Sequence, residues 1–253
     1  MLKADAFRSI IFILLSFAAV FAYAKDKLKK EYLFVALGLF VTIDLWMVDK
    51  RYLNEDDFVS KSRYEQQFNP RQVDLQIKQD PQISYRVFDV TGSPFNDSFT
   101  SRFHKSVGGY HAAKLQRYQD LIERHISRNN QNVLNMLNTK YFIFPNRQTN
   151  QPAVQQNTEA LGNAWFVNEL KMVNNADEEI ESLTNFNPKT TATVDVRFND
   201  YLDGYTPSNP EGSSITLTSY EPNHLIYESK VTGGEKFAVF SEIYYKGGKS
   251  DDG

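Results

Sequence analysis

Two long apolar runs near the N-terminus constrain this chain more than any other feature. Apolar side chains occupy 14 of the 16 residues 9–24 and 14 of the 17 residues 32–48. A membrane-spanning helix needs about 20 mostly apolar residues, with about 17 as the lower limit. The segment 25–31 between the runs is rich in lysine and too short to cross a membrane. The sequence therefore predicts a transmembrane hairpin, with helices over about 7–24 and 31–48.

The first run also fits a secretory signal peptide. Lys3 and Arg8 would precede its hydrophobic centre, and residues 22–24 (Ala-Tyr-Ala) match a cleavage site of the A-x-A type. After cleavage there, a second span would start only seven residues later, which favours the hairpin. N-terminal sequencing separates the two alternatives, because a mature chain that starts at Lys25 would establish the signal peptide.

The orientation of the hairpin depends on its cations. Lys and Arg in short loops concentrate on the cytoplasmic side of a membrane, whereas acidic residues have little influence. The turn carries four lysines within the six residues 25–30, the N-terminal tail carries two cations, and the stretch after the second run carries four more, at positions 50, 51, 61 and 63, so the counts alone are nearly balanced. This density predicts that the turn is cytoplasmic and that both ends of the hairpin lie outside.

One carboxylate, Asp44, interrupts the second apolar run about one helical turn before its end. A carboxylate at the centre of a span costs about 2.5–3.5 kcal/mol on insertion scales, and less near the interface. Two interpretations stay open. Asp44 reaches the headgroup region beside Trp46, or it pairs with a cation or polar group on another helix.

The remainder of the chain has the composition of a mildly acidic folded domain. The absence of Cys excludes a disulfide scaffold, a thiol nucleophile and a Cys-ligated zinc or iron–sulfur site. Aromatic residues make up 14% of the chain, which argues against disorder. The net charge of −3 gives no sign of a nucleic-acid-binding surface.

The hydrophobic pattern predicts an α+β fold with a β-rich C-terminal part. We expect a transmembrane hairpin over 1–48, a juxtamembrane connector over 49–82, an α+β domain over 83–198 and an antiparallel β-rich end over 199–253. Helices are expected over 55–67, 112–126, 131–137 and 175–183. Strands are expected over 85–90, 141–144, 164–173, 190–198, 214–220, 224–231 and 236–245, of which the last three would form one antiparallel sheet. Pro145 would stop the second strand, and residues 146–160 would form an exposed loop.

Motifs of known catalytic chemistry are absent from the sequence. It contains no P-loop, no dinucleotide-binding glycine motif, no G-x-S-x-G and no H-E-x-x-H. Carboxylates are numerous, but their spacing singles out no acid/base pair. The sequence therefore predicts no catalytic residue, no metal ligands and no cofactor.

One loop is the best candidate for contact with a ligand. His104 and His111 lie seven residues apart on either side of a Gly-Gly pair, which is not the spacing of two metal ligands on a helix. The loop is either a turn that caps the following helix, or a segment whose backbone and side chains contact a polar or anionic ligand. Its candidate contact residues are His104, Lys105, Gly108, Gly109, Tyr110 and His111.

Five stretches occur together in a characteristic order: DLWMVDKRYLN at 44–54, YRVFD at 85–89, FHKSVGGYHAAKL at 103–115, LNMLNTKYFI at 134–143 and ALGNAWFV at 160–167. They resemble the YfhO-like family of bacterial membrane proteins, especially those of Bacteroidetes, and the resemblance covers most of residues 30–245. The family consists of large polytopic proteins of the GT-C type of membrane glycosyltransferases.

The resemblance implies transfer of a sugar from a polyprenyl-phosphate donor to a cell-envelope acceptor. It also implies that residues 49–253 lie on the extracytoplasmic side of the bacterial cytoplasmic (inner) membrane. Two features depart from the family pattern. Family members carry more spans before this point, with the acidic residues expected to serve catalysis in an early loop that has no counterpart here. Their pattern also continues with a Trp-containing hairpin, where residues 246–253 look truncated.

We therefore expect a fragment, the non-catalytic C-terminal part of a YfhO-like protein. Its partners would be membrane lipid, the missing transmembrane helices, a polyprenyl-phosphate sugar and an envelope glycan, but no nucleic acid. Asp44 would face the missing helices. One alternative is a stand-alone, membrane-tethered module that binds glycans or proteins, and another is a purely structural scaffold for envelope assembly.

Overall fold

The computed structural model describes residues 2–202 and 204–245, and the predicted truncated tail, 246–253, lies outside them. The chain forms two compact units, residues 1–69 and 70–253, each of which is described by itself. Helices and strands are mixed, as the sequence predicted.

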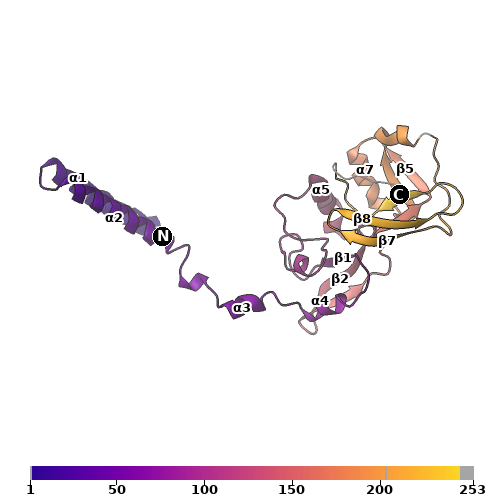
Figure 1. Cartoon of the computed structure of the whole chain (residues 1–253), viewed down its shortest axis with the longest axis horizontal. Helices are drawn as coiled ribbons and strands as arrows, with labels where there is room; N and C mark the ends of the chain where they lie inside the picture. Colours follow the sequence, from indigo (N-terminus) through magenta and orange to yellow (C-terminus); the bar gives the residue numbers. More distant parts are fainter. Residues whose placement is uncertain (1, 203, 246–253) are drawn as a thin grey trace. The chain divides into compact units, whose positions relative to one another are not determined.

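The first unit begins with an antiparallel hairpin of two helices, α1 (Leu2–Ala24) and α2 (Lys30–Asp49), as Figure 1 shows. The α1 helix ends where Asp26 adopts the left-handed conformation, and the Lys27 N–H donates to the Ala22 carbonyl at 2.9 Å. Both helices are long and apolar enough to cross a membrane. The two predicted helices are thus confirmed, and their insertion in a membrane stays a prediction.

Two short helices lie within residues 55–67, so the prediction of one helix over this range is wrong. A 3-10 turn, η1 (Glu55–Asp57), follows Asn54, and a separate helix, α3 (Lys61–Gln66), follows Ser60. The side chain of Asn54 accepts from the Asp56 N–H at 2.8 Å, and that of Ser60 accepts from the Arg63 N–H at 3.4 Å. Each cap starts a new helix, because it satisfies N–H groups that lack a partner within the helix.

A three-stranded sheet forms the centre of the second unit, in the order β1 (Arg86–Asp89), β2 (Thr139–Asn146), β3 (Gln151–Gln156). The β1 strand is parallel to β2, and β2 is antiparallel to β3. Two predictions are wrong here, since β2 continues through Pro145 and residues 151–156 form a strand. Pro145 is tolerated because the β1 ladder ends at Ile143, so that β2 has a partner on one side only at that point.

Helices cover both faces of this sheet. Successive strand residues point to opposite faces, so Val87 packs with Ile77 and Ile143, whereas Phe88 packs in a second core cluster with Ile122 and Leu134. The expected helix 131–137 is present, but the expected helix 112–126 is shorter, because a turn precedes it. The covering helices are α4 (Gln72–Ile77), α5 (Gln116–Arg124), η3 (Ile126–Arg128) and α6 (Gln131–Met136), and the short helix η2 (Thr100–Arg102) lies between β1 and α5 in the chain.

The predicted strand 164–173 is two strands that belong to different sheets. β4 (Ala164–Val167) pairs with β9 (Phe237–Phe240) in antiparallel orientation, and β5 (Glu169–Val173) pairs with β6 (Thr191–Asp195) in parallel orientation. The predicted strand 190–198 ends at Asp195, because the Asp195 side chain caps the 3-10 helix η5 (Val196–Tyr201). The expected acidic helix is α7 (Ala176–Ser182), followed by η4 (Leu183–Asn185).

The C-terminal strands form one predicted hairpin and one unpredicted pairing. β7 (Ser214–Glu221) and β8 (His224–Lys230) are antiparallel, as expected. The expectation that the last strand joins them is wrong, since β9 pairs with β4 through Trp165 and Val239. Gly233 and Gly234 have φ angles of 67° and 79°, and this left-handed turn directs the chain away from β8.

Candidate functional site

The loop 104–111 lies along the free edge of β1. The Val87 N–H donates to the Lys105 carbonyl at 2.8 Å, and the Val107 N–H donates to the Val87 carbonyl at 3.0 Å. Val107 is fully buried in the core. The loop is therefore anchored by its backbone, and the orientation of each side chain decides what it can contact.

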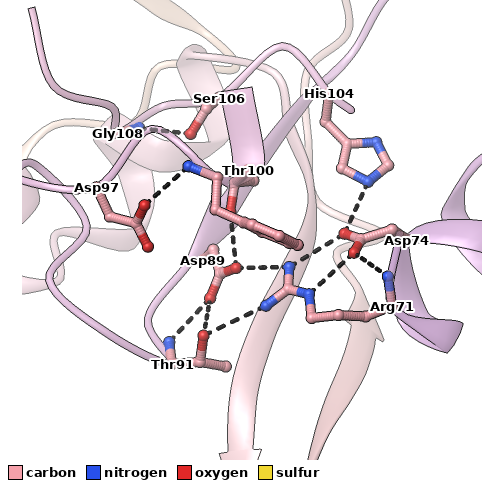
Figure 2. A network of polar contacts seen from close by, with 10 residues as sticks. Arg71, Asp74, Asp89, Thr91, Asp97, Thr100, His104, Ser106 and Gly108 are labelled. Atoms are coloured by element: carbon pink, nitrogen blue, oxygen red, sulfur yellow. Dashed lines mark hydrogen bonds and ion pairs between the residues drawn. The ribbon is translucent and has the colours of Figure 1, made fainter. Parts of the chain in front are cut away.

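His104 points into a closed polar network, which Figure 2 shows. Its Nε2 atom lies 3.1 Å from Oδ1 of Asp74, and the two side chains are 3% and 0% exposed. Arg71 lies between two carboxylates, with Nε 2.9 Å from Asp74 Oδ2 and Nη2 2.8 Å from Asp89 Oδ2. The network joins the start of α4 to the end of β1.

Hydrogen bonds keep both carboxylates of this network ionised. Burial alone would raise the pKa of Asp74, but the hydrogen bonds from His104 and Arg71 outweigh it and hold that pKa well below its ordinary value. The Asp89 side chain is 10% exposed, and its pKa is likewise lowered, because hydrogen bonds from Thr91, Thr100 and Arg71 outweigh the effect of its partial burial. The adjoining cavity measures about 10 Å³, which is room for one water molecule.

The two glycines of the loop allow close backbone packing. A Cβ atom on Gly108 would collide with the carbonyl of Pro94, and Gly109 has a φ of 106°. The Gly109 N–H donates to that same carbonyl at 2.7 Å. Tyr110 is 66% exposed, and exposed His111 accepts a hydrogen bond from the Ala113 N–H at Nδ1. Tyr110 and His111 are therefore available to a ligand, while His104 faces inward.

Lys105 belongs to a second polar cluster, which the sequence did not indicate. Its Nζ donates to Ser84 Oγ at 2.9 Å and lies 2.8 Å from the ring centroid of Tyr220 in β7. Lys105 is exposed as a residue, but partial burial of its ammonium lowers its pKa to about 8; Glu242 opposes this effect, and the charge of Arg86 adds to it.

Arg86 holds the other half of this cluster. Its guanidinium donates to the Leu137 carbonyl at 2.8 Å and to Ser241 Oγ at 2.9 Å, and it pairs with Glu242 at 3.3 Å. The buried hydroxyl of Tyr227 has no hydrogen-bond partner among residues 2–202 and 204–245. The partners of Arg86 all lie far from it in the sequence, so no local sequence motif could reveal the cluster.

Asp44 pairs with the neighbouring helix of its own hairpin. The Arg8 Nε donates to Asp44 Oδ1 at 2.8 Å, and the Arg8 guanidinium also contacts Asp5 at 3.1 Å. Asp5 in turn pairs with Arg51. The structure therefore agrees with the second interpretation of Asp44, in which it pairs with a cation on another helix.

Two hollows open on the surface of the second unit on either side of residues 81–82. One, of about 390 Å³, lies between the end of α4 and the face of β2 and β3. The other, of about 420 Å³, lies between residues 81–83, residues 161–164 and β7. Both volumes are in the range of small-molecule sites.

The Asp74–His104 pair resembles the base and orienting acid of a hydrolase, but its Nε2 is occupied by Asp74 and the ring is buried. Across residues 2–202 and 204–245, no group of three or more His, Asp or Glu residues is arranged to hold a metal ion.

No protein-family model matches this chain, and no curated protein or solved structure is detectably similar to it.

Proposed function

We propose that this chain is the membrane-anchored, extracytoplasmic C-terminal part of a YfhO-like protein, and that it assists sugar transfer by holding the cell-envelope acceptor. The donor would be a polyprenyl-phosphate sugar. The observation that carries the proposal is a domain with two open hollows attached to a hairpin of two apolar helices. The ordered resemblance at 44–54, 85–89, 103–115, 134–143 and 160–167 supports the family.

The charges of the hairpin support the proposed side of the membrane. Four lysines lie in the turn segment 25–30, which the positive-inside rule assigns to the cytoplasm. Residues 49–253 would then be on the same side as the envelope acceptor. A tether confines the domain to the membrane surface, where the lipid-linked donor is also located, and so raises the effective concentration of the acceptor there.

In this proposal the role is accessory, because the buried acid and base groups around Arg71 are engaged with one another. His104, Asp74 and Asp89 are tied to Arg71 or to each other, away from solvent. A domain of this kind contributes binding energy and orientation of the acceptor, which lower the barrier of a bimolecular transfer. The chemical step itself would belong to groups outside this chain.

A transfer assay with the full chain in lipid nanodiscs tests this function. The probes are undecaprenyl-phosphate-glucose as donor and polysaccharide released from a bacterial envelope as acceptor. We expect the chain to bind the polysaccharide and to release no polyprenyl phosphate. Transfer by the chain alone would contradict the accessory role, and failure to bind the polysaccharide would contradict the acceptor-holding role.

The unpaired outer edge of β8 favours a second candidate, a membrane-tethered module that binds proteins. Within the described residues, β8 pairs only with β7. A free strand edge accepts an extended segment of another protein by backbone hydrogen bonds. Stable co-purification with one membrane protein, together with no binding of polysaccharide, would favour this second function over the first.

A further inference from the structure

The hollow of about 390 Å³ exists because α4 covers only part of the sheet. Val73 and Ile77 of α4 pack on one face of the sheet with Ile143. The helix ends at Ile77, and the chain turns away through residues 79–81. The face of β2 and β3 beyond that point is left open, with Tyr141, Val154 and Gln156 along it.

The floor of this hollow is a fixed, charge-balanced group. Asp80 Oδ2 lies 2.5 Å from Lys140 Nζ and accepts from the Tyr141 hydroxyl at 2.8 Å. Asp80 Oδ1 accepts from the Gln82 N–H at 3.0 Å, and Lys140 also donates to the Gln82 side chain at 2.6 Å. The Asp80 side chain is 8% exposed and that of Lys140 is 19% exposed. One negative and one positive charge therefore neutralise each other at the bottom of the hollow.

The rim carries three glutamine side chains, Gln76, Gln79 and Gln156. All three are exposed, and their amides form no hydrogen bond with any residue in the ranges 2–202 and 204–245. Each amide offers a carbonyl acceptor and an NH₂ donor. Val154 and Pro81 add apolar surface between them.

We propose that this hollow binds a neutral saccharide. A sugar hydroxyl both donates and accepts a hydrogen bond, which matches the paired donor and acceptor of each free glutamine amide. The C–H groups of a sugar ring can pack on the apolar surface of Val154 and Pro81. The volume is within the range of small-molecule sites.

The same residues disfavour charged ligands. An anionic ligand would need Lys140 as its partner, but the charge of Lys140 is already paired with that of Asp80. A cationic ligand would need Asp80 as its partner, and the charge of Asp80 is likewise already paired with that of Lys140. Val154 and Gln156 are two residues apart on β3 and therefore present the face of that strand to the hollow, so a peptide held there would not form the regular backbone pairing that the outer edge of β3 offers.

The identity of the saccharide rests on the proposed function, because this hollow would be the place where the domain holds the acceptor. The adjoining hollow of about 420 Å³ shares Pro81 with this one. A linear oligosaccharide that occupies the first hollow would therefore continue past Pro81 toward the second.

Saccharide-observed NMR with the full chain in nanodiscs tests the inference. The probes are cellotetraose, maltotetraose, chitotetraose and mannotetraose, with tetragalacturonic acid and tetraglycine as the anionic and peptide comparisons. The test variant is Gln76→Ala combined with Gln156→Ala. The matched control is Gln155→Ala, which removes the same side chain from the neighbouring position of the same strand, on the opposite face.

We expect at least one neutral tetrasaccharide to bind, with a Kd that rises about tenfold in the double variant because two hydrogen bonds are lost. The Gln155→Ala chain should bind like the unaltered protein. A Gln79→Ala chain should also bind more weakly, which provides a second measurement if the double variant folds poorly.

The inference is overturned if no neutral tetrasaccharide binds, if tetragalacturonic acid or tetraglycine binds in a way that depends on Gln76 and Gln156, or if all variants bind a neutral sugar equally. In the last case the chain still binds a glycan, so the proposed function survives and only the assignment to this hollow fails. A chain that binds neither the tetrasaccharides nor the envelope polysaccharide contradicts both.

Discussion

Burial and pairing with other groups act in opposite directions on the pKa values of ionisable side chains in the second unit. Asp74 is fully buried, yet His104 and Arg71 stabilise its charge and lower its pKa. For Lys105, burial outweighs the attraction of Glu242 and lowers the pKa to about 8. The difference arises because Asp74 receives direct charge-assisted hydrogen bonds, whereas the direct partners of Lys105 are a hydroxyl and an aromatic ring.

Replacing Asp74 by Ala should destabilise the domain by about 3 kcal/mol, because it removes one carboxylate of a buried ion-pair network and leaves Arg71 with Asp89 as its remaining carboxylate. Arg71 and His104 would lose their shared acceptor. Pulse proteolysis in urea on the solubilised chain measures this loss. The control is Glu181→Ala, since Glu181 makes an exposed ion pair with Arg124 at 3.5 Å and should change stability by less than about 1 kcal/mol. Equal effects of the two substitutions would contradict the role of Asp74.

The same network predicts how stability depends on pH. The pKa values of Asp74 and Asp89 are lower in the folded domain than their ordinary values, so the unfolded state takes up protons first as the pH falls. Their contribution is therefore complete above about pH 5 and decreases below about pH 4. The difference in free energy of unfolding between the unaltered chain and Asp74→Ala should shrink over this acid range. A difference that stays constant down to low pH would be inconsistent with an ionised Asp74.

Lys105 should titrate well below an ordinary lysine. After reductive ¹³C-methylation, we expect its NMR signal to titrate near pH 8, whereas ordinary lysines titrate near about 10.4. Replacement of Glu242 by Gln should lower the midpoint further, because this carboxylate stabilises the ammonium. A Lys105 midpoint at the ordinary value would show that Tyr220 and Ser84 do not exclude water from the ammonium.

At the level of elements, the hairpin combines exposed apolar helices with charges clustered at one end. The Phe12 and Phe40 rings face each other at 6.5 Å between centroids, and Arg8 pairs with Asp44 nearby. In a membrane, an unpaired carboxylate at this depth is costly, so the pair should fix how the helices associate.

Arg8→Leu should therefore weaken the hairpin by about 1–3 kcal/mol by leaving Asp44 without its cation. Disulfide formation between cysteines introduced by Phe12→Cys and Phe40→Cys measures helix pairing in membranes. We expect the yield to fall with Arg8→Leu and to recover when Asp44→Leu is added. If the yield stays low in the combined variant, packing rather than charge controls the pairing.

Local signals account for the elements that the sequence predicted. Asn130 caps α6 and Asn175 caps α7, and both helices lie where the pattern placed them. The strand β3 has the polar sequence QPAVQQ, which has the composition of a loop. It forms a strand because β2 offers an unpaired edge beside it, and that partner is invisible in a local window.

At the level of the whole molecule, the proposed topology has a direct test because the chain contains no Cys. Lys27→Cys places a single thiol in the turn, and Ser229→Cys places one at an exposed position of β8. A membrane-impermeant maleimide should label intact spheroplasts carrying Ser229→Cys, and should label Lys27→Cys only after lysis. The reverse pattern would place residues 49–253 in the cytoplasm.

The sequence alone determined the two apolar helices, the mixture of helices and strands and the β7–β8 hairpin, because each depends on residues close together in the chain. It also identified the loop 104–111, of which Tyr110 and His111 face solvent. Whether this loop, or any other predicted contact residue, binds a ligand stays a prediction.

Only the tertiary structure decided which distant segments meet. Pairing of β4 with β9, the contact of Arg86 with Glu242 and the Asp80–Lys140 floor of the polar hollow all join residues that are far apart in sequence. Each closes a long loop, whose entropy cost is recovered only through burial and hydrogen bonds formed across the whole domain. A local pattern contains no record of those partners, so the clusters around Lys105 and in the hollow became visible only in the folded chain.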